Sequence, residues 1–141
     1  MTLYLDTSLL ITALSPEAET DTVQRWIKLN EAEGFAISDW VTAEFSAALS
    51  IKIRAGRMSI DERATALHRF SQLASRTFEK LPIGTQEFQI AARFADQNTT
   101  GLRAGDALHL AVAASASMTL STRDKGLAKA GTSLGISTIL L

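Results

Sequence analysis

The stretch Thr2-Leu3-Tyr4-Leu5-Asp6-Thr7-Ser8-Leu9-Leu10-Ile11 opens the chain and decides how the rest of it folds. An apolar run stops at an acid, and a helix-like pattern resumes directly after it. We predict a buried strand ending at Asp6, followed by a helix capped by Thr7 or Ser8. Ligands bind beyond the carboxyl ends of strands in open α/β sheets. Asp6 is therefore expected on the floor of a site, where its charge must be paired, solvated or bound to a cation.

Composition indicates a globular protein with one core. The chain has 141 residues, of which 46% are hydrophobic and 21% charged, so we expect one domain over residues 1–141. The net charge of -1 provides no general basic field, and contact with nucleic acid would need a local patch or a bound metal. The absence of cysteine excludes disulfides and thiolate metal sites.

The two ends of the sequence do not resemble targeting or membrane segments. Asp6 interrupts the first hydrophobic run, which argues against a secretory signal. The apolar residues 136–141 are too few to span a bilayer and predict a last strand. We therefore expect a cytoplasmic protein that does not contact a membrane.

Strand and helix patterns alternate along the rest of the chain. Strands are predicted at 35–38, at 77–83 as an edge or short strand, at 118–121 and at 136–141. Helices are predicted to begin at about Thr20, after Ser38 or Asp39, at Ser59 with a capping box to Glu62, at Thr85, at Leu102 and at Gly126. This alternation predicts a parallel α/β sandwich, in which successive strand ends open on the same edge.

Glu44 lies inside the helix predicted for about 39–54, on its apolar side. Its neighbours at helical spacing are Trp40, Val41, Ala47, Ala48 and Ile51. Taken alone, such a glutamate could reach solvent at the edge of the core or pair with a distant arginine. It becomes a candidate site residue only in the company of other acids.

Two further acids occupy comparable settings. Asp106 lies near the start of an almost wholly apolar helix, where alone it would contribute about 0.3–1 kcal/mol through the helix dipole. Asp124 follows the strand 118–121, as Asp6 follows the first strand, and alone it would be a helix cap or loop residue. His109 is one turn beyond Asp106, and we interpret it as a packed or hydrogen-bonded core histidine rather than a metal ligand.

The predicted topology brings Asp6 and Asp124 to one rim of the sheet, and the helices that carry Glu44 and Asp106 can close over it. Two carboxylates about 5 Å apart repel by roughly 3 kcal/mol at an effective dielectric near 20, so a cation is needed. Oxygen ligands suit magnesium or manganese and not zinc. Such ions polarise a phosphodiester and lower the pKa of an attacking water, which predicts phosphodiester hydrolysis.

Together the motifs resemble the PIN-domain nucleases, specifically the VapC-type toxins of toxin–antitoxin pairs. They are Asp6-Thr7-Ser8, Glu44 in an apolar helix, LRAGDALHLA around Asp106, and Thr122-Arg123-Asp124. The resemblance implies a three-layer α/β/α sandwich with a central, mainly parallel sheet. It also implies a metal-dependent endoribonuclease whose catalytic acids are Asp6, Glu44, Asp106 and Asp124, with Asp6, Asp106 and Asp124 binding Mg²⁺ or Mn²⁺.

The same resemblance implies supporting residues and partners. Ser8 and Thr122 would orient the carboxylates or a bound water. Gly105 stands where the family more often has alanine, and Leu127 where phenylalanine is commoner, which we expect to affect only local packing. A homodimer and a cognate antitoxin, which inserts a basic side chain near the acids, are also implied. Apolar residues that could line a groove for it are Trp26, Ile27, Trp40, Phe45, Leu49 and Ile53.

Other interpretations stay open from the sequence. A phospho-acceptor or aspartyl phosphatase domain also gathers acids and magnesium at strand ends, but Ser8 stands where the phosphatase pattern has its second acid. A binding module could keep the fold without catalysis, although retention of all four acids argues against it. The basic residues could meet a phosphate backbone, an acidic partner or only solvent: Lys52, Arg54, Arg57, Arg63 and Arg69.

Overall fold

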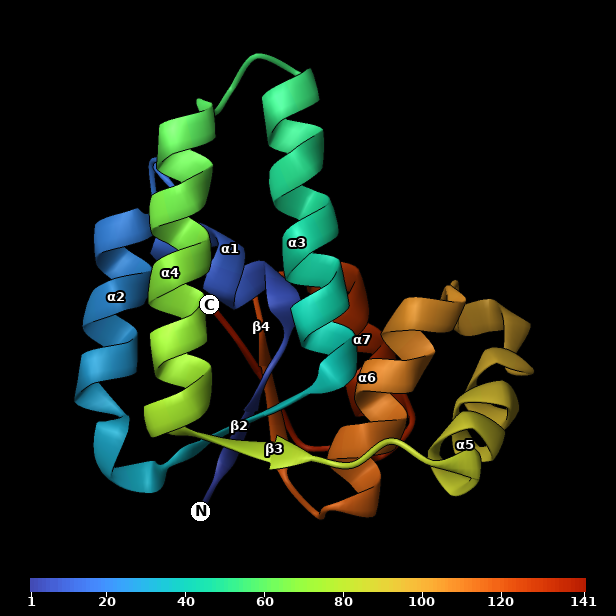
Figure 1. The fold of residues 1–141 in the computed structure, drawn as a ribbon. Helices are drawn as coiled ribbons and strands as arrows, with labels where there is room; N and C mark the ends of the chain where they lie inside the picture. The colour runs from blue at the N-terminus through green and yellow to red at the C-terminus, as the bar shows by residue number, and fades with distance from the viewer.

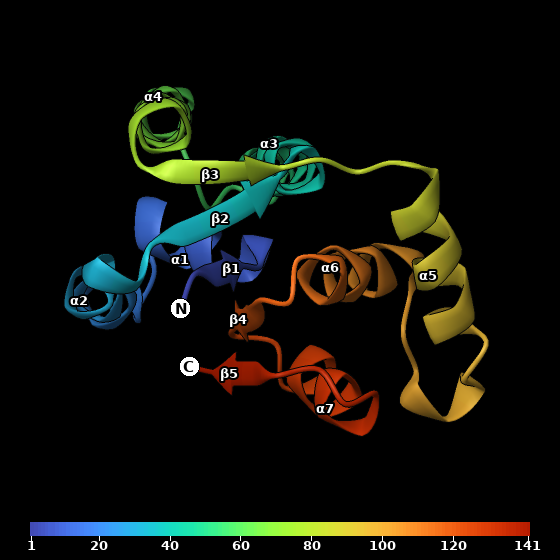
Figure 2. The ribbon, with the colours of Figure 1, turned by 90° about the horizontal axis from the view of Figure 1, so that it is seen from below.

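The computed structural model describes residues 1–141 and contains one five-stranded sheet. Its strands are β1 (Leu3–Leu5), β2 (Phe35–Ser38), β3 (Phe78–Leu81), β4 (Thr119–Thr122) and β5 (Thr138–Leu140). They lie in the order β3-β2-β1-β4-β5, and every pairing is parallel (Figure 2). All residues of β1, β2 and β4 are buried, as expected for inner parallel strands covered on both faces.

Seven α-helices connect the strands (Figure 1). They are α1 (Thr7–Leu14), α2 (Thr20–Leu29), α3 (Asp39–Arg54), α4 (Ile60–Arg76), α5 (Thr85–Ala95), α6 (Ala104–Ser115) and α7 (Lys125–Ser133), with short 3-10 helices at Glu31–Glu33 and Asn98–Thr100. None of these helices combines the length and the apolar character that crossing a membrane requires.

The helices form the outer two layers of an α/β/α sandwich. Right-handed crossovers keep α1, α2 and α4 on one face while the chain proceeds from β1 to β3. The chain then returns across the sheet, so α6 and α7 cover the other face, and α5 packs outside α6 (Figure 2). The predicted three-layer sandwich is confirmed, and its sheet is wholly parallel.

The helix starts show which predictions of capping were right. Ser59 and Glu62 exchange backbone-to-side-chain hydrogen bonds of 3.0 Å at the start of α4, which confirms the capping box. The prediction that Thr7 or Ser8 caps α1 is wrong, because Asp6 occupies that position and both hydroxyls donate to carboxylates instead. Thr85 is likewise the first residue of α5 and not its cap.

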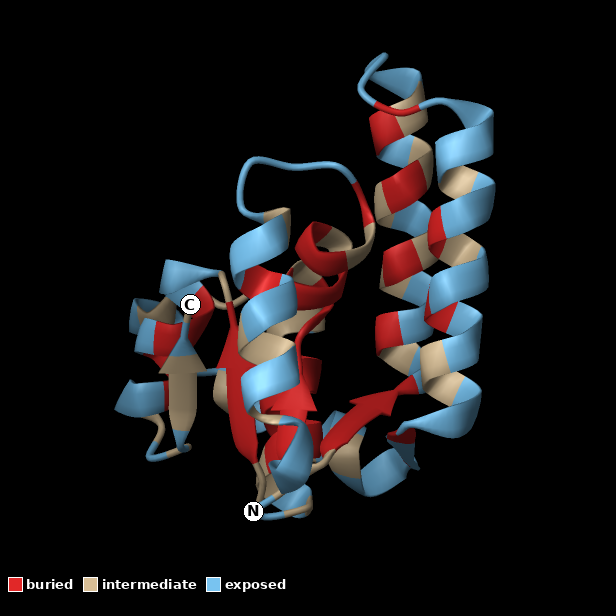
Figure 3. Cartoon of the chain, turned by 90° about the vertical axis from the view of Figure 1, so that its left-hand side faces the viewer, coloured by how far each residue is buried: buried red, intermediate tan, exposed pale blue.

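Helix α3 presents different apolar residues to the core and to the solvent. Phe45 stacks on Phe70 of α4, with ring centroids 4.5 Å apart, and Leu49 is also fully buried. Phe45 and Leu49 therefore cannot line a groove for a protein partner, contrary to the expectation from the sequence. Ala47 and Ile51 are exposed, so the apolar side that carries Glu44 faces outward along much of α3. Figure 3 shows the buried strands and the mixed burial of the helices.

Lys52 belongs to the interior and not to a basic surface. Its ammonium donates to Ser15 Oγ at 3.0 Å and pairs with Glu17, which is held in turn by Thr12. Buried cations are usually paired in this way. Of the predicted basic residues, Lys52 is thus not available to a phosphate backbone.

Candidate active site

The structure brings the four predicted acids to one open pocket of about 340 Å³. Asp6 follows β1, Asp124 follows β4, Glu44 lies in the second turn of α3, and Asp106 in the first turn of α6. Because β1 and β4 are adjacent parallel strands, with Leu5 opposite Ser121, the residues after them meet at the same sheet edge. The other lining residues are Thr7, Ser8, Ile11, Ala47, Ala48 and Ile51.

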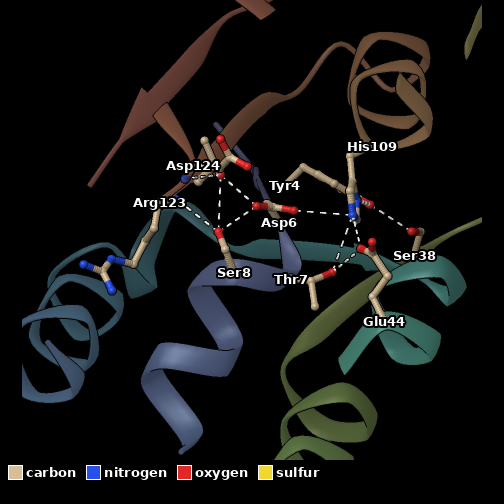
Figure 4. Close-up of polar contacts among 10 residues, drawn as sticks. Tyr4, Asp6, Thr7, Ser8, Ser38, Glu44, His109, Arg123 and Asp124 are labelled. Carbon is tan, nitrogen blue, oxygen red and sulfur yellow. Dashed lines mark hydrogen bonds and ion pairs between the residues drawn. The ribbon is translucent and has the colours of Figure 1, made fainter. Parts of the chain in front are cut away.

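The Asp6 carboxylate is fixed through one of its oxygens. Only 5% of Asp6 is exposed, and its Oδ2 accepts hydrogen bonds of 2.7 Å from both Ser8 Oγ and Thr122 Oγ1 (Figure 4). Its Oδ1 lies 3.3 Å from His109 Nε2. Two donors on one oxygen set the direction of the carboxylate, so both residues predicted to support the site do contact Asp6.

The Glu44 carboxylate is fixed in the same manner. Its Oε1 accepts a 2.7 Å hydrogen bond from Thr7 Oγ1 and another from His109 Nε2. Partial burial raises the pKa of Glu44, but the hydrogen bond and charge of His109 and the Thr7 hydroxyl outweigh it and lower the pKa overall. Glu44 is therefore an ionised carboxylate that is half-buried and held at one oxygen.

The other Glu44 oxygen, Oε2, lies beside α6. A Cβ atom added at Gly105 would be 3.3 Å from Oε2 and 3.2 Å from Cζ2 of Trp40. The glycine therefore lets α6 approach closely the side of α3 that carries Glu44. A side chain at this position would therefore affect an oxygen of Glu44 as well as local packing, whereas the sequence indicated an effect on packing alone.

Asp106 and Asp124 differ in how they are held. Asp124 caps α7, with Oδ1 accepting a 3.1 Å hydrogen bond from the backbone N–H of Leu127. Burial raises the pKa of Asp106, and repulsion from Asp124 and Asp6 raises it further. The negative charges of the pocket thus act on one another, as expected for acids gathered around a cation position.

The turn after β4 is tied to α1 by two hydrogen bonds from Arg123 and is closed by a third within the turn. The backbone N–H of Arg123 donates to Ser8 Oγ at 3.1 Å, and that of Asp124 donates to Thr122 Oγ1 at 3.0 Å. The Arg123 guanidinium reaches away from the carboxylates (Figure 4). It donates to Thr12 Oγ1 at 3.0 Å. These contacts hold Asp124 in register with Asp6.

His109 contacts the acids directly, which the sequence did not indicate. It is 1% exposed, and its Nδ1 lies 2.9 Å from the Tyr4 hydroxyl, which lies 2.8 Å from Ser38 Oγ. Burial raises the pKa of Tyr4 far above its ordinary value, so its hydroxyl keeps its proton. The interpretation of His109 as a hydrogen-bonded core histidine agrees with these contacts. Its spacing of three residues from Asp106 was the available signal that it faces the site.

The free oxygens of the pocket fit a divalent cation. Glu44 Oε2 and Asp124 Oδ2 are not used by the hydrogen bonds described above, and the only polar contact described for Asp6 Oδ1 is the one with His109 Nε2 at 3.3 Å. Carboxylate oxygens in an open pocket are the donors that Mg²⁺ and Mn²⁺ prefer. One ligand atom each of Asp6, Glu44 and His109 also lie within 4.8 Å of one another.

Comparisons with known proteins agree with this architecture. The sequence profile of the PIN domain matches residues 3–132. The solved structure of PAE2754 from Pyrobaculum aerophilum is similar to the chain, with 26% identity, a TM-score of 0.66, and coverage of 92% of this chain and 87% of that one. No curated protein sequence matches the chain significantly.

Two solved VapBC structures are also similar in fold. VapBC2 from Rickettsia felis, bound to a DNA fragment from their promoter, has 18% identity and a TM-score of 0.73, with 99% of this chain and 98% of that chain covered. VapBC-5 from Mycobacterium tuberculosis, a member of the VapBC family of toxin-antitoxin systems, has 22% identity and a TM-score of 0.63, with the same coverage.

Proposed function

The chain belongs to the PIN-domain family, and from that premise we propose that it is a metal-dependent endoribonuclease acting as the toxin of a toxin–antitoxin pair. The observation that carries the proposal is the pocket in which Asp6, Glu44, Asp106 and Asp124 meet. PIN domains are generally nucleases, and the similarity to VapBC structures supports the VapC-type role. The proposal treats residues 1–141 as one nuclease domain working in the cytoplasm.

Asp6, Asp106 and Asp124 are the residues that would hold Mg²⁺ or Mn²⁺. Their oxygens come from two strand ends and one helix start, and Ser8 and Thr122 keep Asp6 directed by its bound oxygen. When bound, the ion supplies Lewis acidity at the phosphodiester and offsets the negative charge of both phosphate and acids. This would let a chain with a net charge of -1 bind RNA at its acidic pocket.

Glu44 has the position to orient the attacking water. Its Oε1 is occupied by Thr7 and His109, which leaves Oε2 to accept a hydrogen bond from a water in the pocket. A carboxylate held at one oxygen loses little freedom when its other oxygen binds, and a well-oriented nucleophile lowers the barrier. The Thr7 hydroxyl, at the first residue of α1, thus serves the reaction instead of capping the helix.

An antitoxin and a second copy of the chain are the proposed protein partners. The pocket offers an antitoxin a cluster of carboxylates for a basic side chain. Exposed apolar residues lie beside it on α3, where Ile51 is 50% exposed and Ala47 is also exposed. A partner that covers this side of α3 would bury apolar surface and block the acids together.

Cleavage of labelled RNA tests the proposal. Purified protein with Mg²⁺ or Mn²⁺ should cut RNA internally, and Asp6→Asn should slow cleavage by at least about 100-fold, because it removes a charge from the proposed ion site. Asp21→Asn, an exposed acid on α2, is the matched control and should cleave as the wild type does. Cleavage unaffected by Asp6→Asn would end the proposal. No cleavage of any RNA would favour the binding module.

A further inference from the structure

A chain of buried hydrogen bonds connects four secondary-structure elements beneath the pocket. It runs from Ser38 at the end of β2 to Tyr4 of β1, then to His109 of α6, and ends at Glu44 of α3 (Figure 4). Ser38 and Tyr4 are 0% exposed and His109 is 1% exposed. Buried polar groups are nearly always hydrogen-bonded, and in this chain of hydrogen bonds every buried side chain has a partner.

The direction of the hydrogen atoms in this chain follows from its last member. The Glu44 carboxylate is ionised and can only accept, so His109 Nε2 carries a hydrogen and donates it. In neutral His109 the Nδ1 atom accepts from the Tyr4 hydroxyl, whose oxygen accepts from Ser38. In a doubly protonated ring Nδ1 would donate to Tyr4, yet Nε2–H would still point at Glu44. The bond to Glu44 is therefore the same in either protonation state.

This hydrogen bond conflicts with a ligand role for His109. The Nε2 atom and Glu44 Oε1 are in direct hydrogen-bond contact, so no ion fits between them. The other ring nitrogen is occupied by Tyr4. Coordination through Nε2 would require the ring to give up its hydrogen and the glutamate to move away, although Asp6, Glu44 and His109 together have the spacing of a three-residue cation site.

We propose that His109, held by Tyr4 and Ser38, is a positioning residue that fixes Glu44 and does not bind the metal ion. With Thr7 it occupies Oε1, so Oε2 is the oxygen left for the pocket. Glu44 needs this support because it is only half-buried and its side chain is long, so without the two hydrogen bonds it would sample several rotamers. The part of this inference that concerns catalysis rests on the proposed ribonuclease function. The part that says His109 does not coordinate the metal ion is independent of that function.

The experiment compares His109→Gln, His109→Leu and Tyr4→Phe with the wild type. A glutamine amide can place a donor near the position of Nε2, whereas leucine fills the space without one. His68→Leu, at an exposed position on α4 and the only other histidine, is the matched control. The three measurements are the dissociation constants of Mn²⁺ and Mg²⁺, the electron spin-echo modulation of bound Mn²⁺, and kcat and KM for RNA cleavage.

We expect wild-type Mn²⁺ spectra without a directly coordinated ¹⁴N, and an unchanged ratio of Mn²⁺ to Mg²⁺ affinity in His109→Leu. We also expect kcat to fall about 10-fold or more in His109→Leu at similar KM, with substantial recovery in His109→Gln and a smaller loss in Tyr4→Phe. His68→Leu should match the wild type throughout.

Three results would overturn the inference. A ¹⁴N coupling that disappears in His109→Leu would make His109 a ligand, as would a selective loss of Mn²⁺ affinity. An undiminished kcat in a folded His109→Leu protein would remove its positioning role. If His109→Leu unfolds, the triple variant Ser38→Ala, Tyr4→Phe, His109→Leu replaces it, because it also removes the two buried hydroxyls that would otherwise lose their partners. A wild type that binds Mn²⁺ without cutting RNA contradicts the proposed function, and the Mn²⁺ spectra then still decide whether His109 is a ligand.

Discussion

Thr122 Oγ1 donates a 2.7 Å hydrogen bond to Asp6 Oδ2, although the two residues lie 116 positions apart in the chain. The same hydroxyl accepts from the backbone N–H of Asp124 at 3.0 Å. One threonine therefore sets the direction of Asp6 and the position of Asp124. It stands at the end of β4, next to β1, where it can do both because the strands are parallel neighbours.

Thr122→Val should lower RNA cleavage about 10-fold, because the isosteric methyl cannot donate to Asp6 or accept from Asp124. Thr122→Ser keeps the hydroxyl and should retain most of the activity. Cleavage rates and Mn²⁺ titrations of both variants measure the effect. Equal rates in the valine and serine variants would show that the hydroxyl is not needed.

Gly105→Ala should slow cleavage by roughly 3- to 10-fold, because the added methyl displaces Glu44 Oε2 and the Trp40 ring by a few tenths of an ångström. The higher helix propensity of alanine should keep the protein at least as stable. Trp40→Phe in the same chain removes Cζ2 and Nε1 and should restore much of the rate. Steady-state kinetics and a thermal melt of the single and double variants check this. A rate unchanged by Gly105→Ala would contradict the role given to the close approach.

Asp106→Asn should raise the Tm of the protein in excess chelator by roughly 2–4 °C at pH 7, since it removes a charge that is partly buried and repelled by Asp124 and Asp6. In free energy this is about 1 kcal/mol or less, because Asp106 is only partly buried and solvent screens it.

The advantage of Asp106→Asn should also depend on pH. The pKa of Asp106 is raised, so the folded wild type binds this proton more tightly than the unfolded chain does. Between the ordinary aspartate pKa and the raised value, wild-type stability falls as the pH rises. The Tm difference between the variant and the wild type should therefore shrink as the pH is lowered toward 4. A Tm difference that is constant with pH would show that the charge of Asp106 is not its cause.

Mg²⁺ or Mn²⁺ should raise the Tm of the wild type, because a ligand bound only by the folded state stabilises it. At 100 times the dissociation constant the gain is about 2.7 kcal/mol. Asp106→Asn and Asp6→Asn should blunt the rise, and Asp21→Asn should not. A response that persists undiminished in both site variants would place the ion elsewhere on the molecule.

Expression of the wild type without an antitoxin should arrest growth of the host cell, and Asp6→Asn should relieve the arrest at equal protein levels. Growth curves with immunoblots of the soluble fraction measure both. Harmless overproduction of an active, soluble wild type would count against the toxin role.

Strand and helix patterns predicted the architecture well because the buried inner strands are short apolar runs, whereas the helices carry apolar residues at helical spacing. The same reasoning placed Asp6 and Asp124 at adjacent strand ends, since parallel strands end on the same edge. Glu44 and Asp106 needed the additional assumption that two helices close over that edge, and both line the pocket.

The hydrogen-bond donors of the site could not be predicted in this way. Thr7 and Ser8 are of the residue types that commonly cap helices, but in the structure each hydroxyl donates to a nearby carboxylate. A hydrogen bond to a charged carboxylate is stronger than one between neutral groups, such as a cap that accepts from a backbone N–H. His109 lies on an almost wholly apolar helix, where only its spacing of three residues from Asp106 indicated the side that faces the site, and that spacing could not identify Glu44 as its partner. Likewise, the apolar residues of α3 did not reveal that Phe45 faces the core and Ile51 the solvent.

The sheet order also affects when the pocket can exist during protein synthesis. β1 emerges from the ribosome first, but one of its two neighbours, β4, is made more than a hundred residues later. Until then Asp6 has neither Thr122 nor Asp124 beside it, and an unfinished chain carries no complete set of acids. Translation therefore delays the appearance of the site until most of the polypeptide has been made, which leaves time for a partner to arrive.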